Sequence, residues 1–391
     1  MIQITWTSHL EPTYKLAALS VTLANLLRTY SRTQPPSGYH NRIRSTLVLV
    51  GLNIFNAASL CNLRMELWAC GFNAWNQLQF EGDLPDEPED VLSFKRVLRA
   101  EGTVVSNDPS DLHKEIKVAG SPDGFLQARL EQATGLNSTQ PSEERTDSKI
   151  PEDTASKATA AGNDKIAAFT PTTLIQYPSL AAYLSQANPD FTFPVPHITQ
   201  LVSNTTTFTA LTQEGNVYTW GDERYPSCLG REPTSSNPAS QPALLASLVS
   251  LPTGRIHKLS SSGPLTAALT TGHDLYIWGR TNTPSIIPEL KDSSSFLSSV
   301  DYDPIPLDIH GADILDFSIG ENHMLVLTTD GELYVIGENG NGQLGLGDRE
   351  KERCEEWRLV DLGFERGSTK KCVGVRAGYK CSFALVKDLS S

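Results

Sequence analysis

The glycine-rich segment Gly340-x-Gly342-x-x-Gly345 has the spacing of a dinucleotide-binding fingerprint, and it follows a segment that we expect to be a strand. Such a fingerprint binds a pyrophosphate only when a helix begins at the glycines and directs its N-terminus at the phosphates. Residues 344–347 read Leu-Gly-Leu-Gly, and this further glycine disfavours a helix. We therefore predict no cofactor for this chain.

The histidines and cysteines do not have the spacing of a metal site. Zinc sites usually hold two ligands a few residues apart, and this chain has no Cys-x-x-Cys and no His-x-x-x-His. We expect the 6 cysteines to be reduced thiols, as in a cytoplasmic or nuclear protein. The histidines that invite a catalytic or metal interpretation are His257, His273, His310 and His323.

Two pairs of acidic residues could in principle form acid–base couples. They are Glu355 with Glu356 and Asp301 with Asp303, and both are more typical of solvated loops. The sequence contains no nucleophile elbow, no phosphate loop and no calcium loop. We therefore predict no catalytic residues and no metal site, and we do not expect an enzyme of covalent chemistry.

Repeated segments around a glycine indicate the elements that must position any functional residue. Four six-residue segments share the order polar, aliphatic, aromatic, variable, bulky or Cys, Gly, and a weaker copy occupies residues 116–120. The last three of the four are 58 residues apart, and a period of about 50 residues is typical of propeller blades. The four segments are residues 66–71, 216–221, 274–279 and 332–337.

The residues before these segments repeat as well. Residues 208–215, 265–272 and 324–331 each predict a short strand that ends in a polar turn with glycine, which is the signature of a β-hairpin. Trp68, Trp220 and Trp278 occupy related positions near the end of the segments, so we expect them to pack the blades. The fold class predicted is therefore all-β, a β-propeller.

The last repeat carries a more specific pattern. Gly337-x-Asn339-x-x-x-Gln343-Leu344 follows a strand, and His323 occupies a Gly-x-x-His position before it. This pattern resembles the repeat of the regulator-of-chromosome-condensation family. The resemblance covers about residues 65–82 and 198–386, and it implies a propeller of four-stranded blades, seven in the family and five to seven here.

The resemblance also implies that strands from opposite ends of the chain complete one blade. Residues 372–386 repeat the first half of a unit, and residues 65–78 supply the missing second half. We expect residues 66–71 to pair with residues 381–386, which would remove two exposed sheet edges. The five copies fall short of seven, so either the ring is smaller or a blade is hidden in residues 121–197.

Composition divides the chain into a propeller over residues 65–386 and an extension over residues 1–64. The extension has six cations and one anion, whereas the whole chain has a net charge of −13. It is either a targeting segment or upstream sequence wrongly joined to the reading frame, and we favour the second. Residues 137–165 have almost no bulky apolar side chain, so we expect a disordered loop within the propeller.

The charge balance and the resemblance together predict the partners. With 32 Lys and Arg against 45 Asp and Glu, the chain should repel nucleic acid, and we expect no membrane segment and a monomer in the cytoplasm or the nucleus. The resemblance implies protein partners, including guanine nucleotide exchange on a small GTPase by the founding member and adaptor roles in others. We expect a partner to contact His323, Glu338, Asn339 and Asn341.

A different function is an alternative at this point. A propeller hydrolase or lyase would hold its site in the central channel, where ionisable residues converge from several blades at the same strand. The repeated segments present aliphatic and aromatic residues instead. We therefore favour a protein-binding propeller that regulates a small GTPase or another signalling partner.

Overall fold

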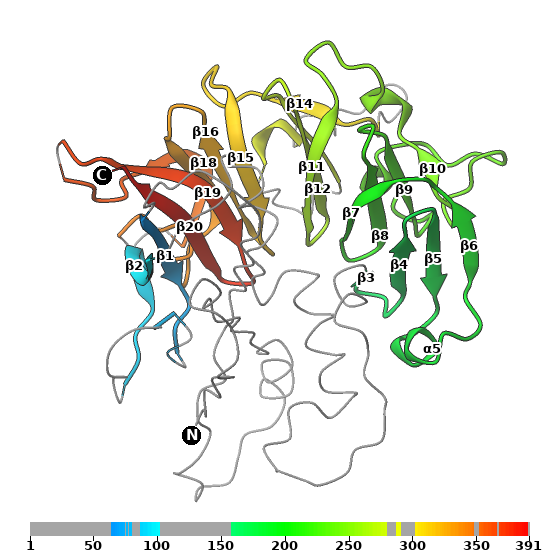
Figure 1. Cartoon of the computed structure of the whole chain (residues 1–391), viewed down its shortest axis with the longest axis horizontal. Coiled ribbons are helices and arrows are strands. Elements are labelled where there is room, and N and C mark those ends of the chain that lie inside the picture. The colour runs from blue at the N-terminus through cyan, green and yellow to red at the C-terminus, as the bar shows by residue number, and fades with distance from the viewer. Residues whose placement is uncertain are drawn as a thin grey trace, which may run out of the picture.

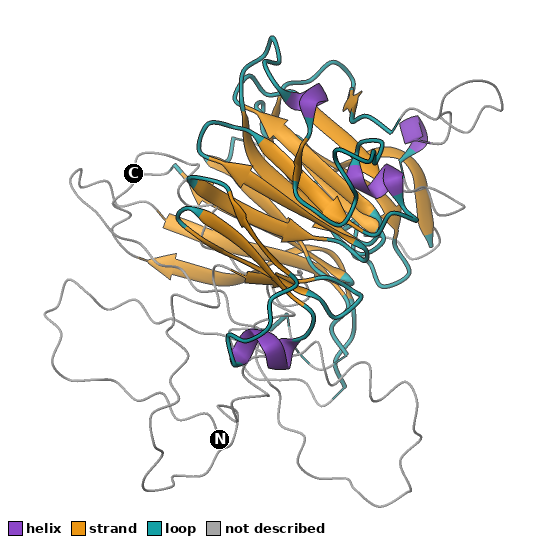
Figure 2. Cartoon of the chain, turned by 90° about the vertical axis from the view of Figure 1, so that its right-hand side faces the viewer, coloured by secondary structure: helices purple, strands orange, loops and turns teal. Residues whose placement is uncertain are grey.

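The computed structural model describes residues 64–74, 76, 78–79, 87–101, 158–279, 287–290, 302–347, 352–365 and 367–389. Within these ranges it contains five four-stranded antiparallel sheets that follow one another along an arc (Figure 1). The two α-helices in the described residues are a single turn each and lie in connections (Figure 2). The all-β prediction with four-stranded blades is confirmed.

Four sheets are built from consecutive strands. The first contains β3 (Ala158–Ala160), β4 (Ile166–Thr170), β5 (Thr173–Tyr177) and β6 (Phe191–Pro194). The second contains β7 (Ile198–Ser203), β8 (Thr207–Thr212), β9 (Val217–Gly221) and β10 (Ala243–Leu244). The third contains β11 (Ile256–Ser262), β12 (Leu265–Thr270), β13 (Leu275–Gly279) and β14 (Ile305–Leu307). The fourth contains β15 (Ile314–Ile319), β16 (His323–Thr328), β17 (Leu333–Glu338) and β18 (Arg353–Val360). The helices are α5 (Leu180–Leu184) and α6 (Pro226–Leu229), and short 3-10 turns occupy Ala246–Leu248 and Pro288–Leu290.

The fifth sheet, called the closing sheet below, takes strands from both ends of the described chain. Its order is β19 (Lys370–Ala377), β20 (Cys381–Asp388), β1 (Arg64–Gly71) and β2 (Val91–Glu101). The register between β20 and β1 runs from Glu66 opposite Val386 to Gly71 opposite Cys381. The predicted pairing of residues 66–71 with residues 381–386 is therefore confirmed.

The repeated segments form the third strand of four sheets, and apolar side chains fill the space between neighbouring sheets. Trp220 and Trp278 are fully buried in β9 and β13, as expected for blade-packing residues. Trp68 in β1 is half-buried and packs edge-on against Phe364, with ring centroids 5.4 Å apart. One core cluster joins residues of the closing sheet, such as Phe383, to residues of β15–β18.

The blade that was predicted to be hidden in residues 121–197 is present, and its first strand lies inside the loop that was predicted to be disordered. Strands β3–β6 lie in residues 158–194, within the segment in which a blade was predicted to be hidden. Residues 158–165, the end of the predicted disordered loop, form β3 and the turn after it, so the prediction is wrong for these residues. The small side chains of β3 are buried against the neighbouring sheet, where Thr159 Oγ1 lies 2.8 Å from Ser203 Oγ, and the turn at residues 162–164 is exposed. Residues 137–157, residues 1–63 and the weak copy at 116–120 lie outside the described residues.

Gly71 is expected to be essential for the closing sheet. Its φ is +112°, and a Cβ placed there would collide with the carbonyl oxygen of Lys380 and lie 2.6 Å from Cys381 Cα. We expect Gly71→Ala to lower the free energy of unfolding by about 2 kcal/mol or more, from backbone strain and this collision. Urea unfolding of both variants measures this, with Gly340→Ala as the control because a Cβ at Gly340 meets nothing within 4 Å. Equal losses in the two variants would contradict the role of Gly71.

Candidate functional site

The first strand of four sheets carries a β-bulge at the same place. The bulges lie between residues 198 and 200, 256 and 258, 314 and 316, and 372 and 374. A bulge inserts one extra residue and redirects the side chains beside it. The extra residues are Thr199, His257, Leu315 and Val373, and Gln200, Lys258, Asp316 and Gly374 follow them.

These first strands lie toward the inside of the arc, and the fourth strands lie toward its outside (Figure 1). Neighbouring first strands contact each other, as β15 and β19 do, whereas the fourth strands are the opposite edges of their sheets. The bulges therefore bring equivalent residues of successive sheets together on the inner side of the molecule.

The residue after the bulge binds the backbone of the next first strand. The Gln200 amide donates to the Leu259 carbonyl oxygen at 2.7 Å and accepts from the Leu259 N–H at 2.8 Å. Lys258 donates to the Phe317 carbonyl oxygen at 2.7 Å. Buried hydrogen bonds of this kind set the register between neighbouring sheets, because an unpaired buried group is costly.

Lys258, Asp316 and Arg376 form a group of charges from three successive sheets. The Asp316 side chain is 1% exposed and lies between the Lys258 ammonium and Arg376 Nη1, the latter at 3.3 Å. It also accepts from the Val375 N–H at 2.8 Å. Burial, with repulsion from Arg376, lowers the pKa of Lys258 to about 8. Two cations thus surround one carboxylate, and the group carries a net positive charge while Lys258 is protonated.

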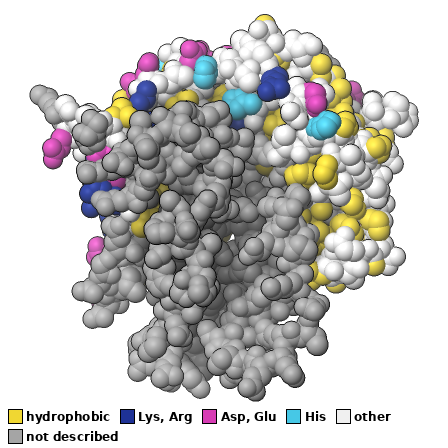
Figure 3. Space-filling model, in the orientation of Figure 1, with side chains coloured by type: hydrophobic (Ala, Val, Ile, Leu, Met, Phe, Trp, Pro, Cys, Tyr) yellow, Lys and Arg dark blue, Asp and Glu magenta, His cyan; other side chains and the backbone are white. Residues whose placement is uncertain are grey.

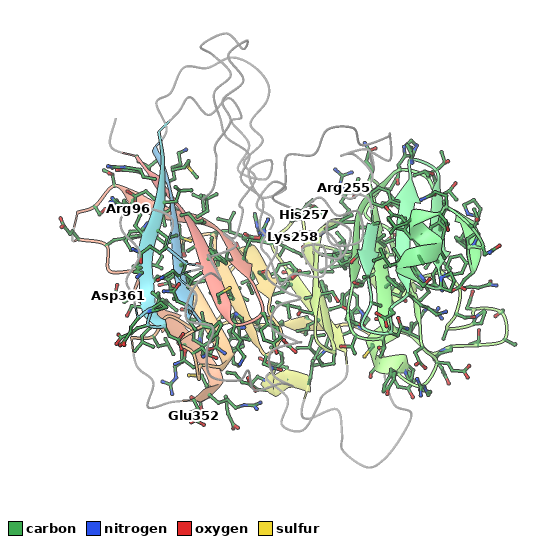
Figure 4. All side chains as sticks on the ribbon, turned by 90° about the horizontal axis from the view of Figure 1, so that it is seen from below. Arg96, Arg255, His257, Lys258, Glu352 and Asp361 are labelled. Carbon is green, nitrogen blue, oxygen red and sulfur yellow. The ribbon has the colours of Figure 1, made fainter. Side chains whose placement is uncertain are left out.

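Exposed and half-buried basic side chains continue this group outward. Arg255 and His257 are exposed, and Arg255 Nη1 donates to the Gln213 carbonyl oxygen at 2.9 Å. His273 Nδ1 lies 3.0 Å from the Ile314 carbonyl oxygen. Figure 4 shows Arg255, His257 and Lys258 close to one another. Histidine and basic side chains also lie near each other on the face shown in Figure 3. The axial cluster, as we use the term, consists of Arg255, His257, Lys258, His273, Asp316 and Arg376.

The axial cluster was not predicted, because the repeated segments form the third strands of their sheets, whereas the cluster lies on the first strands. The signal was available, since Lys258 and Asp316 are separated by 58 residues, the spacing of the last three repeated segments. His257 and His273 were considered singly, and the structure brings them near each other and near Lys258.

His323 and Asn339, two of the four residues predicted to contact a partner, have no exposed surface. His323 Nε2 lies 3.0 Å from Ser382 Oγ of the closing sheet, and burial lowers the pKa of His323 to about 4. Asn339 Oδ1 accepts from the Leu344 N–H at 3.1 Å and so holds the loop after β17. Both side chains serve the packing of the sheets, which a pattern of residue types does not distinguish from a surface role.

Glu338 and Asn341, the other two predicted residues, are half-buried. Asn341 Nδ2 donates to Asp90 Oδ2 at 3.1 Å, so this loop is joined to the segment that leads into β2. Glu338 ends β17 beside the His323–Gly337 pair, at the opposite end of the sheet from the bulge before Asp316. Contact of either side chain with a partner stays a prediction.

The glycine-rich segment is explained by close packing. No helix begins at residues 340–347; the loop instead lies against β2. A Cβ at Gly345 would collide with the Phe94 ring and lie 3.0 Å from Cys70 Sγ, and a Cβ at Gly342 would lie 2.9 Å from Leu92 Cα. Two of the three glycines in the spacing that resembles a nucleotide fingerprint, Gly342 and Gly345, are therefore explained by contact with the neighbouring strand, whereas Gly340 makes no such contact.

The described ranges show neither a metal site nor a membrane-spanning helix. They contain no group of three or more His, Cys, Asp and Glu residues that could hold a metal ion. No disulfide is formed by the five cysteines in these ranges, which are Cys70, Cys228, Cys354, Cys372 and Cys381. None of the helices in these ranges has the length and apolar character needed to cross a membrane.

Five four-stranded antiparallel sheets along an arc, one of them built from both ends of the described chain, are the architecture of a β-propeller. Models of the regulator of chromosome condensation (RCC1) repeat match residues 314–343 and 330–385. This chain is a divergent RCC1-like repeat protein.

The relatives are distant and longer than the matched segment. The chain is 27% identical over 192 residues to "RCC1 domain-containing protein RUG3, mitochondrial" of Arabidopsis thaliana. This match covers 48% of this chain and 40% of that protein. The chain is also 29% identical over 159 residues to "Protein pim1" of Schizosaccharomyces pombe. This match covers 39% of this chain and 28% of that protein. The chain thus matches less than half the length of these relatives.

Two solved structures match this chain at low sequence identity. Prp20p of Saccharomyces cerevisiae, described with its binding to Gsp1p and histones, matches with a TM-score of 0.45 and 17% identity over 59% of this chain and 56% of that one. Human WBSCR16 matches with a TM-score of 0.44 and 14% identity over 84% of this chain and 100% of that one.

Proposed function

We propose that this protein is a binding platform that regulates a protein partner, and that the axial cluster is part of its binding surface. The observation that carries the proposal is the contrast between two neighbouring positions. Gln200, Lys258 and Asp316 repeat one role, a bond to the backbone of the next sheet. The preceding residue differs from sheet to sheet, and His257 there is exposed. A residue that the blades do not require in common is free to recognise a partner.

A small GTPase is the partner that we favour, with exchange of its bound guanine nucleotide as the regulatory step. This proposal rests on membership of the RCC1 repeat family and on the fact that exchange needs no covalent chemistry. We further propose that the protein acts as a monomer in the cytoplasm or the nucleus.

The exchange activity is tested with a panel of small GTPases loaded with fluorescent GDP. We expect the purified protein to accelerate GDP release from at least one of them, and the double variant Arg255→Ala with His257→Ala to weaken this effect about tenfold. The matched control is Arg224→Ala, because Arg224 is exposed and follows β9 at the opposite end of its sheet from the bulges. Failure to accelerate or to bind any GTPase would remove this partner class.

The axial cluster has one feature that the enzyme alternative requires, because ionisable residues from three sheets converge there. Acid–base catalysis needs a group within reach of a substrate proton. Asp316 is 1% exposed and is held by two cations, and Lys258 is bound to Asp316 and to the Phe317 carbonyl oxygen. This arrangement favours binding. Turnover of generic esters or glycosides that is lost in Asp316→Asn, without loss of folding, would reverse that preference.

A further inference from the structure

The axial cluster carries local positive charge on an acidic protein. The chain has a net charge of −13, yet Lys258 and Arg376 both bind the single buried carboxylate of Asp316, and Arg255 lies three residues before Lys258. His257 and His273 lie beside them. An anionic group is therefore attracted to this part of the surface more strongly than to the rest of it.

The region of positive charge around the axial cluster is bordered by acidic side chains and does not extend far along the surface. Arg255 lies just before β11, and 58 residues later the equivalent position before β15 is the exposed Asp313. Glu214 is exposed on the turn after β8, close enough to Arg255 for their charges to interact. A long polyanion would have to cross acidic surface on both sides, whereas nucleic-acid affinity needs cations along an extended path.

The hydrogen-bond donors of the axial cluster that remain available to a bound anionic group lie on separate side chains and do not point to one place. Lys258 and Arg376 already bind Asp316 and the backbone oxygens of Phe317 and Val375. The exposed donors are on Arg255 and His257, which are separate side chains. Desolvation and the charge of Lys258 lower the pKa of His257, so Arg255 is the cation and His257 a neutral hydrogen-bond donor at pH 7. A single phosphate is held by several donors that meet at one point, whereas a cation and a separate donor suit carboxylates carried by an extended peptide.

We infer that the axial cluster binds a short acidic segment of a protein partner, with Arg255 and His257 as its direct contacts. This inference rests on the proposed protein-binding function and specifies the chemistry of the bound segment. Asp316 and its two cations hold the inner strands in register, so they position the contacts and keep the local charge positive.

Fluorescence anisotropy with labelled peptides tests the inference on the full chain. The probe is a 12-residue peptide of alternating Asp and Gly, and the comparison probes are its Asn and Gly equivalent and a single-stranded oligonucleotide of equal charge. We expect the acidic peptide to bind more tightly than both, with an affinity that falls as NaCl increases. The double variant Arg255→Gln with His257→Gln should bind it about tenfold more weakly, and Arg224→Gln should bind it as the unchanged protein does.

Two outcomes would overturn the inference: equal binding of the acidic peptide by the double variant, or tighter binding of the oligonucleotide. Both variants change exposed side chains, and their far-UV circular dichroism and melting temperature confirm that they fold. The same double variant in the GTPase assay separates the two proposals. If the unchanged protein accelerates exchange, and the double variant weakens that exchange, but the unchanged protein does not bind the acidic peptide, the acidic-segment inference fails and the proposed function stands.

Discussion

Replacing Asp316 by asparagine is expected to lower the free energy of unfolding by about 3–5 kcal/mol. The side chain is 1% exposed, and removal of its charge leaves Lys258 and Arg376 as neighbouring cations at an inner, poorly hydrated position. The carboxylate accepts from the Phe317 N–H through one oxygen and from the Val375 N–H through the other, and an asparagine can keep only one of these bonds, so the loss includes one hydrogen bond as well as the charge. Urea unfolding at neutral pH, followed by tryptophan fluorescence, measures it.

A second substitution distinguishes repulsion from general disruption. Adding Lys258→Met to Asp316→Asn should recover a large part of the loss, because one cation is removed and Arg376, 17% exposed, can reach water. Asp222→Asn is the matched control, since Asp222 forms an exposed pair with Arg224 and should cost less than about 1 kcal/mol. A loss below about 1 kcal/mol in Asp316→Asn would show that the inner charges do not hold the sheets.

The stability of the protein should fall by about 3 kcal/mol between pH 7 and pH 4 through His323 alone. Burial lowers its pKa to about 4 in the native state, whereas the unfolded chain has the ordinary value of 6.5. Below pH 6.5 the unfolded state binds a proton that the native state does not, so acid favours unfolding. The contribution is complete above pH 6.5, is lost as the pH falls toward 4, and changes no further below that.

The comparison of the unchanged protein with His323→Asn over this pH range isolates the effect from carboxylate titration. The variant should be less stable at pH 7, because it loses packing and the contact with Ser382, and the difference should shrink by about 3 kcal/mol at pH 4. A difference that stays constant with pH would mean that His323 is protonated in the folded protein or accessible to water.

The sequence predicted the arrangement of strands well because the repeated segments have a local cause. The glycine that ends each segment and the hairpin turn before it depend on neighbouring residues, and the pairing of residues 66–71 with 381–386 follows from counting half-units. Residues 158–165 were misjudged, since alanine and threonine can be buried where two sheets approach closely, as Thr159 and Ser203 do.

The candidate site was harder to predict because it depends on contacts between sheets. The residue type of His323 does not indicate whether its side chain contacts Ser382 inside the protein or a partner at the surface. The sequence of a single strand does not show where a β-bulge lies. The convergence of Lys258 and Asp316 can therefore be recognised only when strands 58 residues apart are placed side by side.

The closing sheet has a consequence for synthesis of the protein. Strand β1 leaves the ribosome early, but its neighbour β20 is made 310 residues later, since Gly71 pairs with Cys381. At ordinary rates of translation this is a delay on the order of tens of seconds. During that time β1 can pair with β2 but has an open edge, which other chains could join. A nascent chain of this protein should therefore depend on a chaperone until its last strand is released.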